Sequence, residues 1–329
     1  MTKLNYYIFI ICLTILFQCS NIGAKTLKKA TFIPQWVPQA QFAGYYMALH
    51  KGIYKRHGID LTIIDGGPER PSDVFLKERK ADFATLWLST AIKMRAEGVR
   101  LVNIAQIIQK SALMLVAKKS SGIKRPKDMD GKKVGLWGPL FQVQPKAFFK
   151  KYNIRVIPVR QSYSVNLFLR GGMDVASAMW YNEYHTILMA GVDPEELSTF
   201  FFYDYGLNFP EDGIYTLEDK FKSDPMLCKA FVKASIEGWN YAFTHPEETL
   251  DVILKNLKRV HIPANRVHQR WMLERMKDLI LTQGLDTKMG VLKKEGYLRV
   301  ARLLKENGLI DNIPKYEHFY FSVIDYENR

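Results

Sequence analysis

The sequence predicts an α/β protein built from two domains. Its 329 residues exceed the length of one average domain, and 47% of them are hydrophobic, which is enough apolar material for two cores. Short apolar runs alternate with segments of helical periodicity, an order typical of sheets whose strands are joined by helical crossovers. One strand-to-helix pattern occurs twice, as expected if each domain carries a copy.

The alternating elements follow one another from the first predicted strand onward. The first helix should end at Gly58, which supplies a left-handed closing residue after the basic last turn. A later helix over 223–243 should begin with Asp224 as its N-cap and Pro225 in its first turn. In the first part of the chain, the stretch 28–37 is predicted as a short strand followed by a turn at Pro34 and Pro38. Further strands are predicted over 59–67, 81–88, 99–109 and 112–120, and helices over 39–58, 71–80 and 89–98.

Residues 1–24 are typical of a secretory signal peptide. Lys3 precedes an apolar run from Tyr6 to Phe17, which is shorter than the roughly 20 residues that a membrane-spanning helix needs. Cleavage after Ala24 would release a periplasmic protein. An uncleaved segment would leave the protein anchored in the membrane, and lipidation at Cys19 is a weaker alternative because the preceding residues do not form a lipobox.

Cysteine usage and charge narrow the function classes. Cys228 would be the one cysteine left after cleavage, so an internal disulfide is excluded, and its helical pattern indicates a packed side chain. The formal net charge of +14 allows a nucleic-acid partner in principle. The basic residues are scattered, however, and no nucleic-acid-binding motif accompanies them. We therefore expect a solvated basic surface and no nucleic acid, with an acidic membrane or acidic partner left open.

The repeated strand-to-helix unit runs from Ala81 to Val99 and from Gly172 to Val192. Each copy begins with an aspartate, continues through small and apolar residues, and reaches a tryptophan before the helical stretch. In open α/β sheets, ligands collect beyond the carboxyl ends of the strands. We therefore expect the two tryptophans, Trp87 and Trp180, to face one cleft as aromatic walls.

Other polar patterns are less specific. Glu211 and Asp212 form an acid pair without a partnered nucleophile, so we expect solvent-exposed acids in a turn. Two histidine pairs are spaced two helical turns apart, too far for a shared metal ion without further ligands. We expect these to be surface histidines: His50, His57, His261 and His268.

Four stretches resemble the periplasmic pyrimidine-binding and thiamine-pyrimidine synthase superfamily: "PQWVPQAQFAGYYMALHKGIYKRHGIDLTI", "GKKVGLWG", "GGMDVASAMWYNEYH" and "EDGIYTLEDKF". The resemblance extends from Thr31 to about Leu254. It implies a two-lobed type II periplasmic binding protein with a cleft between the lobes. One lobe would comprise residues 30–118 and 213–329, and the other residues 119–212.

The resemblance implies one of two biochemistries. Bacterial members bind a thiamine-precursor aminopyrimidine, or a similar heterocycle, for an ABC importer. Fungal members make the pyrimidine phosphate from pyridoxal phosphate and histidine with iron. Leu86 and Thr90 stand where the synthase has its lysine and histidine, the "NFPEDGIYTLE" stretch lacks the cysteine-rich iron motif, and Phe141 replaces a glycine of the phosphate turn. Binding without a cofactor is therefore expected, and the synthase with pyridoxal phosphate and iron remains the alternative.

The resemblance also implies how the ring is held. Glu183 matches the acid that reads the ring edge, because a carboxylate accepts hydrogen bonds from an amine or a protonated ring nitrogen. Trp36 and Trp87 would stack on the ring, while Tyr45, Tyr181 and Tyr215 would form walls or donate hydroxyls, with core packing as the alternative for each. The expected partner is an inner-membrane ABC permease, or a sensor kinase if the protein is a periplasmic ligand sensor. A pyrimidine, a pyridoxal-like ring and a flavin precursor all satisfy this pattern.

Overall fold

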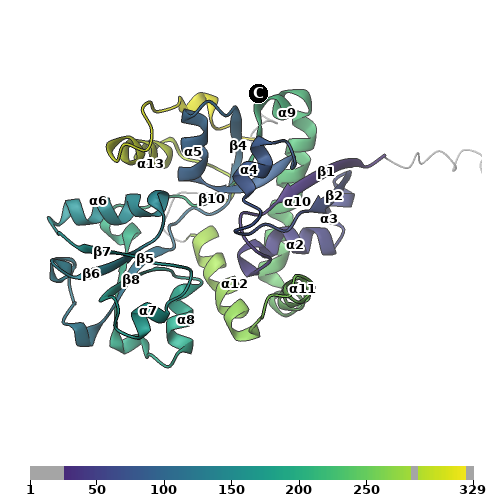
Figure 1. The fold of residues 1–329 in the computed structure, drawn as a ribbon. Coiled ribbons are helices and arrows are strands. Elements are labelled where there is room, and N and C mark those ends of the chain that lie inside the picture. Colours follow the sequence, from purple (N-terminus) through teal and green to yellow (C-terminus); the bar gives the residue numbers. More distant parts are fainter. Residues whose placement is uncertain (1–25, 283–287, 324–329) are drawn as a thin grey trace, which may run out of the picture.

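The computed structural model describes residues 26–282 and 288–323, so the predicted signal peptide at 1–24 lies outside the described residues. Two five-stranded mixed sheets, each flanked by helices, form two lobes (Figure 1). The predicted two-lobed α/β fold is therefore confirmed. None of the helices in the described ranges combines the length and the apolar composition that spanning a bilayer requires.

The sheet of the first lobe has the order β2-β1-β3-β10-β4. β1 pairs in parallel with β2 and β3, and β10 returns antiparallel between β3 and β4. Every residue of β4 and β10 is buried, as expected for central strands covered on both faces. The strands are β1 (Lys28–Ile33), β2 (Ile59–Ile63), β3 (Phe83–Trp87), β4 (Leu101–Gln106) and β10 (Asp212–Leu217).

The sheet of the second lobe has the order β7-β6-β8-β5-β9. β5 pairs antiparallel with both β8 and β9. The first crossing between the lobes therefore lies at 107–112, and the predicted boundary at residue 118 is corrected, because it would have placed β5 in the first lobe. The strands are β5 (Leu113–Lys118), β6 (Lys133–Leu136), β7 (Ile157–Arg160), β8 (Val175–Met179) and β9 (Leu197–Phe201).

The helices cover both sheets, and one predicted helix is split. The helix expected over 39–58 breaks at Gly52, whose φ of 64° is left-handed, while Gly58 closes the segment with a φ of 81°. The second lobe carries η4 (Pro139–Gln142), α6 (Val143–Lys151), α7 (Asn166–Leu169) and α8 (Glu183–Met189). The first lobe carries η1 (Ala40–Phe42), α2 (Ala43–His50), α3 (Ile53–Arg56), α4 (Ser72–Lys77), α5 (Leu88–Ala96), α9 (Glu218–Ser223), α10 (Pro225–Thr244), α11 (Pro246–Arg259) and α13 (Lys294–Glu306).

The long helix α10 begins as its sequence predicts. The carboxylate of Asp224 accepts a hydrogen bond from the backbone N–H of Leu227 at 3.1 Å, and Pro225 occupies the first turn. Cys228 is fully buried in this helix, and burial raises the pKa of its thiol to about 12. The prediction that Cys228 is a packed side chain is therefore confirmed.

Helix α12 (Arg266–Ile280) lies between the two lobes (Figure 1). On the side of the first lobe, the side chain of Gln269 accepts a hydrogen bond from the backbone N–H of Ala40 at 2.8 Å. On the side of the second lobe, the indole N–H of Trp271 donates to the carbonyl oxygen of Trp180 at 2.9 Å. Although α12 follows the helices of the first lobe in the chain, it contacts both lobes.

Two histidines join α12 to α8. The Nδ1 atoms of His185 and His268 lie 2.9 Å apart, and Nε2 of His268 lies 2.9 Å from the side-chain oxygen of Asn182. Burial and the neighbouring His185 lower the pKa of His268 to about 4. The expectation that His268 is a surface histidine is wrong, because the helix places this side chain against the second lobe.

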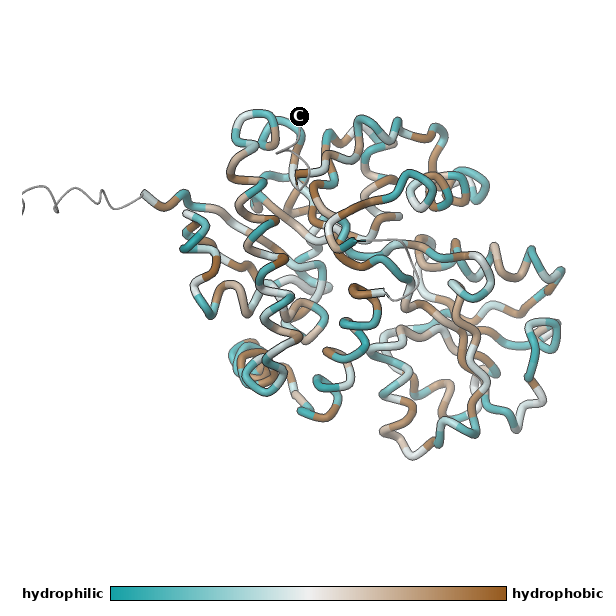
Figure 2. Tube along the Cα trace, turned by 180° about the vertical axis from the view of Figure 1, so that it is seen from behind, coloured by the Kyte–Doolittle hydropathy of each residue, from teal (hydrophilic) through white to brown (hydrophobic). Residues whose placement is uncertain are grey.

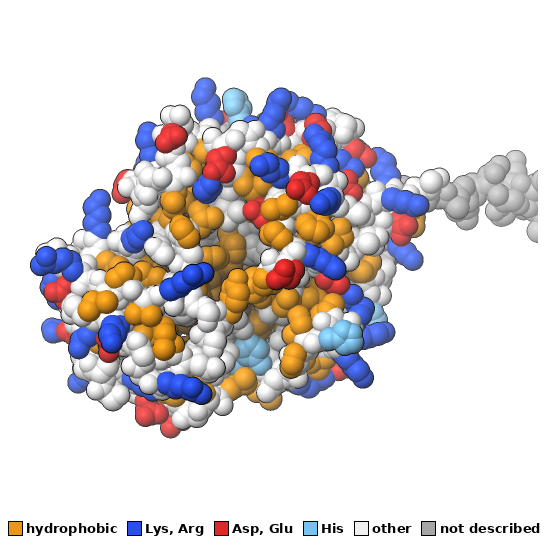
Figure 3. Space-filling view, in the orientation of Figure 1, with side chains coloured by type: hydrophobic (Ala, Val, Ile, Leu, Met, Phe, Trp, Pro, Cys, Tyr) orange, Lys and Arg blue, Asp and Glu red, His pale blue; other side chains and the backbone are white. Residues whose placement is uncertain are grey.

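Hydrophobic and charged side chains are distributed as the composition suggests. Hydrophobic stretches run through the interior of both lobes, whereas hydrophilic stretches lie on the outer helices (Figure 2). Lys and Arg side chains are spread over the face seen in Figure 3, with acidic side chains between them. Exposed ion pairs such as Arg259 with Asp65, at 2.6 Å, are part of this surface. The visible face therefore carries dispersed basic residues without one dominant basic patch.

Candidate ligand-binding site between the lobes

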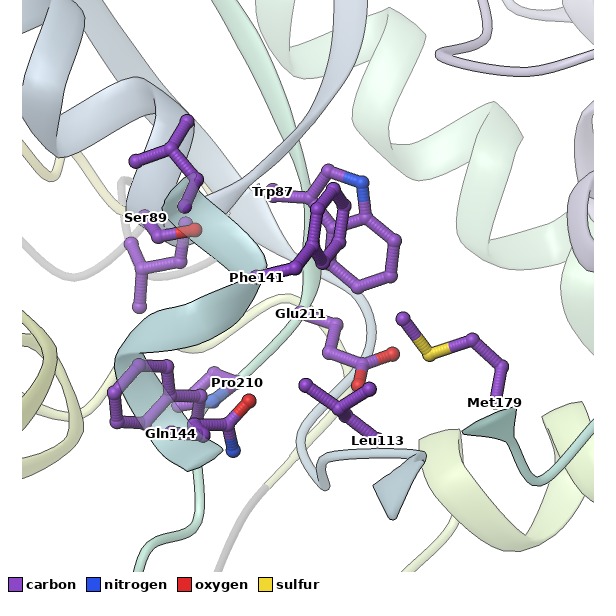
Figure 4. A pocket seen from close by; sticks show the side chains of 11 residues that line it. Trp87, Ser89, Leu113, Phe141, Gln144, Met179, Pro210 and Glu211 are labelled. Carbon is purple, nitrogen blue, oxygen red and sulfur yellow. The ribbon is translucent and has the colours of Figure 1, made fainter. Parts of the chain in front are cut away.

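Both lobes contribute to a pocket of about 320 Å³, part of which is open to solvent (Figure 4). Hydrophobic side chains surround the recess between the lobes in Figure 3. The lining is mainly apolar with a few polar groups, which is typical of small-molecule sites. It comprises Trp87, Leu88 and Ser89 of the first lobe, Leu140, Phe141, Gln144 and Met179 of the second, and Leu113, Phe209, Pro210 and Glu211 next to the crossings.

The repeated unit of the sequence is also a repeated unit of the structure. Asp82 precedes β3 and accepts a hydrogen bond from the backbone N–H of Thr31 in β1, at 2.8 Å. Asp174 precedes β8 and accepts from the backbone N–H of Lys133 in β6, also at 2.8 Å. Each carboxylate thus links its strand to the neighbouring parallel strand. Both units deliver the carboxyl end of a strand to the interface between the lobes.

Only one of the two matching tryptophans lines the pocket. Trp87 ends β3, and its ring lies 5.3 Å from that of Phe141 in an edge-to-face arrangement. Trp180 lies one residue further from its aspartate than Trp87 does, and side chains alternate between the two faces of a strand. Its ring instead packs 5.5 Å from Phe201 and 4.8 Å from the guanidinium of Arg275. The expectation of two facing tryptophans is therefore corrected: Phe141 is the aromatic side chain that the second lobe presents to the pocket.

A second aromatic contact joins the lobes. The ring of Trp36, which follows β1, lies 5.0 Å from the ring of Tyr163 in the second lobe. Tyr163 is 70% exposed, so the contact lies at the surface of the molecule. Trp36 is not part of the pocket lining, and its predicted stacking on a ligand stays a prediction.

Two of the predicted tyrosines lie in the core of the first lobe. Tyr45 is 1% exposed and packs against Phe32 and Trp239, with ring centroids 4.7 and 5.9 Å away. Tyr215 is fully buried in β10 and packs 6.1 Å from Phe319. Neither ring lines the pocket. The surroundings of both tyrosines are therefore those of packed core residues, which was the alternative to a role in the site.

Glu183 is buried but satisfied by its own turn. One carboxylate oxygen accepts from the backbone N–H of Met179 at 2.9 Å, and the other from the side chain of Asn182 at 2.8 Å. It is 8% exposed, and burial raises its pKa. It stands in the first turn of α8, beside the pocket residue Met179, without itself lining the pocket. Its predicted role as the ring-reading acid stays a prediction.

The acid pair that we expected to be exposed is buried. Glu211 and Asp212 are each 3% exposed, because the second crossing, which brings the chain back to the first lobe and leads into β10, runs between the lobes. Asp212 accepts hydrogen bonds from the side-chain amides of Gln35, at 2.5 Å, and Gln41, at 3.0 Å. Glu211 accepts from the backbone N–H of Ala112 at 2.6 Å. The expectation of solvent-exposed turn acids is therefore wrong.

Asp212 lies close enough to Glu211 to change the protonation of Glu211. Burial raises the pKa of Asp212 to about 7. Burial, and then the charge of Asp212, raise the pKa of Glu211 well above its usual range. Burial also raises the pKa of Tyr181, as do the charges of Glu211, Asp212 and Glu183. Tyr181 is therefore the predicted site tyrosine that lies within the electrostatic reach of all three carboxyls.

The residue-by-residue prediction missed most of the pocket lining. Leu140, Phe141 and Gln144 come from η4 and α6, and the sequence assigned no ligand contact to them, although the resemblance places Phe141 in the phosphate turn of the synthase. Glu211 had one usable signal, since it stands next to a second acid immediately before a strand of apolar residues. Once the path of the chain between the lobes is known, an acid in that position lies between them.

Comparison with known proteins now identifies the family. Residues 39–249 match the family model described as "NMT1/THI5 like". The chain belongs to the NMT1/THI5-like family. Among curated relatives, the riboflavin-binding protein RibY of Chloroflexus aurantiacus is 23% identical over 299 residues, covering 85% of this chain and 82% of RibY.

Two further matches, one to a curated protein and one to a solved structure, extend the comparison. The formylaminopyrimidine-binding protein of Halalkalibacterium halodurans is 22% identical, covering 79% of this chain and 81% of that protein. Among solved structures, the periplasmic aliphatic sulphonate binding protein SsuA from Escherichia coli superposes with a TM-score of 0.71 at 15% identity, covering 90% of this chain and 92% of that one. At this identity, the likeness to SsuA shows the fold alone: the NMT1/THI5-like chain has the fold of a periplasmic binding protein.

Proposed function

We propose that this protein is a solute-binding protein that holds a flat nitrogen heterocycle between its lobes, a thiamine-precursor aminopyrimidine being the favoured ligand. The observation that carries the proposal is the pocket itself, in which Trp87 of one lobe meets Phe141 of the other. Flat rings pack well against such aromatic side chains. The two relatives are named for ligands that contain flat nitrogen heterocycles, which supports the ligand class.

Capture would proceed by closure of the lobes. The crossings at 107–112 and just before β10 link the two sheets, so rotation about them would move Phe141 and Tyr163 relative to Trp87 and Trp36. A ligand that contacts both lobes binds the closed arrangement better than an open one and raises its population. Closure also removes water from the ring faces.

We further propose export to the periplasm and delivery to an inner-membrane ABC permease. The support is the pattern of residues 1–24 and the fold shared with a periplasmic binding protein. If the signal segment were not cleaved, the same protein would stay anchored to the membrane. A sensor role, with closure read by a membrane kinase, would use the same pocket.

The synthase alternative finds less support in the pocket. Pyridoxal phosphate is held covalently by a lysine amine, and the described residues that line this pocket include no lysine and no histidine. Leu86, at the position that the synthase resemblance assigns to that lysine, is buried in β3. The residues present therefore do not fit pyridoxal phosphate.

The decisive experiment is native mass spectrometry of the protein purified from the periplasm of its own host. We expect a bound mass that corresponds to an aminopyrimidine and is released on unfolding. Titration calorimetry with 4-amino-5-hydroxymethyl-2-methylpyrimidine, with an alkanesulfonate as the comparison ligand, tests the class directly. Binding of the sulfonate alone would overturn the proposal, and pyrimidine formation from pyridoxal phosphate and iron would restore the synthase.

A further inference from the structure

Glu211 is held rigidly where the two crossings meet. Its backbone N–H donates to the carbonyl oxygen of Ile108 at 3.1 Å, and its carbonyl oxygen accepts from the backbone N–H of Leu88 at 3.2 Å. Its Oε1 accepts from the backbone N–H of Ala112 at 2.6 Å and from the hydroxyl of Ser111 at 3.1 Å. These four contacts fix the direction of the side chain.

The other carboxylate oxygen, Oε2, is buried and has no hydrogen-bond partner within the described part of the chain. Figure 4 shows the Glu211 carboxyl group pointing toward the space bounded by Trp87, Leu113 and Met179. A buried polar atom without a partner is costly, and such exceptions in a native fold call for an explanation. A bound ligand that donates a hydrogen bond at this point would supply one.

Neighbouring polar groups are already committed. Both oxygens of Asp212 accept from glutamine amides. The side-chain amide of Gln144 donates to the hydroxyl of Ser111 at 3.0 Å and to the carbonyl oxygen of Leu207 at 2.9 Å. Both carboxylate oxygens of Glu183 are occupied in its own turn. Glu211 thus differs from these three residues in offering a free acceptor inside the pocket.

We propose that Oε2 of Glu211 accepts an N–H from the ring edge of the ligand, so that the site selects amino-bearing or protonated nitrogen heterocycles over their oxo analogues and over anions. This inference rests on the proposed function and names the ligand class that the same pocket takes. An exocyclic amine or a protonated ring nitrogen donates to the ionised carboxylate, whereas a ring carbonyl or a sulfonate would set lone pairs against the ionised oxygen.

The raised pKa of Glu211 sets the condition for this selection. Burial and then the neighbouring Asp212 raise that pKa, so the empty site favours the neutral acid, whose proton lies on Oε2 because Oε1 already accepts two hydrogen bonds. When an aminopyrimidine with a basic ring nitrogen binds, this proton passes to the ring nitrogen, and Oε2 becomes the acceptor of a carboxylate beside a protonated ring. Such charge-assisted hydrogen bonds are roughly twice as strong as neutral ones. A ligand without a basic nitrogen leaves the proton on Oε2 and makes at most a neutral hydrogen bond with it.

The substitution Glu211→Gln tests the inference with little change of shape. Its amide oxygen can still accept from Ala112 and Ser111, while the amide nitrogen places a donor where Oε2 stood. We expect the affinity for 4-amino-5-hydroxymethyl-2-methylpyrimidine, measured by titration calorimetry, to fall about 10- to 100-fold. The affinity for the 4-oxo analogue should stay the same or rise. Glu195→Gln, at an exposed position of the second lobe, is the matched control and should bind like the wild type.

The outcomes separate this inference from the proposed function. If the wild-type protein binds neither ring, the proposed function fails and the inference fails with it. If the wild type binds the amino compound and Glu211→Gln binds it equally well, only the inference fails. A loss confined to Glu183→Gln would assign the ring edge to Glu183 and also refute the inference. If Glu211→Gln does not fold, the affinities of the wild-type protein for the amino and 4-oxo compounds test the inference. Equal affinities for the two compounds would contradict selection by Oε2.

Discussion

Replacing Asp212 by asparagine should stabilise the folded protein at neutral pH and leave its stability near pH 4 almost unchanged. Burial raises the pKa of Asp212 from 3.8 to about 7, so the folded state keeps the proton over a range in which the unfolded chain loses it. Each unit of difference corresponds to about 1.36 kcal/mol. The ionisation of Asp212 therefore opposes folding by about 4 kcal/mol above pH 7, and this penalty disappears as the pH falls to about 4.

The surroundings of Asp212 can accommodate an amide. Gln35 and Gln41 both donate to the carboxylate, while the side-chain oxygen of Gln35 has no partner among the described residues. Rotating the Gln35 amide by half a turn would let that oxygen accept from the amide nitrogen that Asp212→Asn introduces, while Gln41 still donates to the remaining side-chain oxygen. No hydrogen bond needs to be lost. Removing the Asp212 charge also lowers the pKa of Glu211, which acts in the same direction.

Urea unfolding from about pH 4 to about pH 8 measures this difference in the ligand-free protein. The free energy of unfolding of Asp212→Asn should exceed that of the wild type by a margin that grows from near zero to a few kcal/mol. Asp60→Asn, at an exposed position of β2, should show no such margin. A margin that is independent of pH, or a variant that is less stable near pH 8, would refute the assignment of the raised pKa to a buried Asp212.

Three further predictions concern ligand affinity, helix packing and the contact at α12. Trp87→Ala should weaken aminopyrimidine binding by about 1–3 kcal/mol in a calorimetric titration, the range for a base stacked on an aromatic ring. Trp180→Phe is the control and should bind like the wild type, because Trp180 packs against Phe201 and Arg275. Equal losses of affinity in the two variants would contradict the placement of Trp87 in the site. Gly238→Ala should lower the free energy of unfolding, measured in urea, by at least about 1–3 kcal/mol, because the added Cβ would overlap the backbone of α2 at Gly44. Gly138→Ala is the control and should be neutral, because its Cβ would meet nothing within 4 Å. An unchanged stability of Gly238→Ala would contradict the close packing of α2 on α10. Because the pKa of His268 is lowered to about 4, its contribution to the free energy of unfolding is fully present above about pH 6.5 and is lost as the pH falls toward 4. His268→Gln should therefore lose less stability than the wild type between about pH 6.5 and pH 4 in urea unfolding. An equal loss in both proteins would argue against a neutral His268 in the folded state.

Local patterns were sufficient for the fold class. Strand and helix periodicity, the N-cap at Asp224 and the closing Gly58 depend on neighbours in the sequence, so they could be predicted from the chain alone. The repeated unit was also visible, because Asp82 and Asp174 perform the same hydrogen-bonding role in both sheets. The break at Gly52 was missed, since the apolar pattern continues through it.

The candidate site was less accessible to sequence reasoning, because it is assembled from segments that are distant in the chain. Phe141 reaches Trp87 only through the approach of the two lobes. Tyr45 and Tyr215 belong to a residue type that is common in binding sites, but the packing of the first lobe places them in its core.

Two α/β lobes with a repeated strand-to-helix unit follow from local sequence patterns, since strand alternation, caps and glycine turns are local properties. The burial of particular acids and the contacts between particular aromatic rings depend instead on how distant segments of the chain pack together. The burial of Glu211 and Asp212 follows from the path of a crossing segment between two sheets. The free energy of a carboxyl group depends on that surrounding medium and on charges contributed by other segments, and neither is a property of its neighbours in the chain.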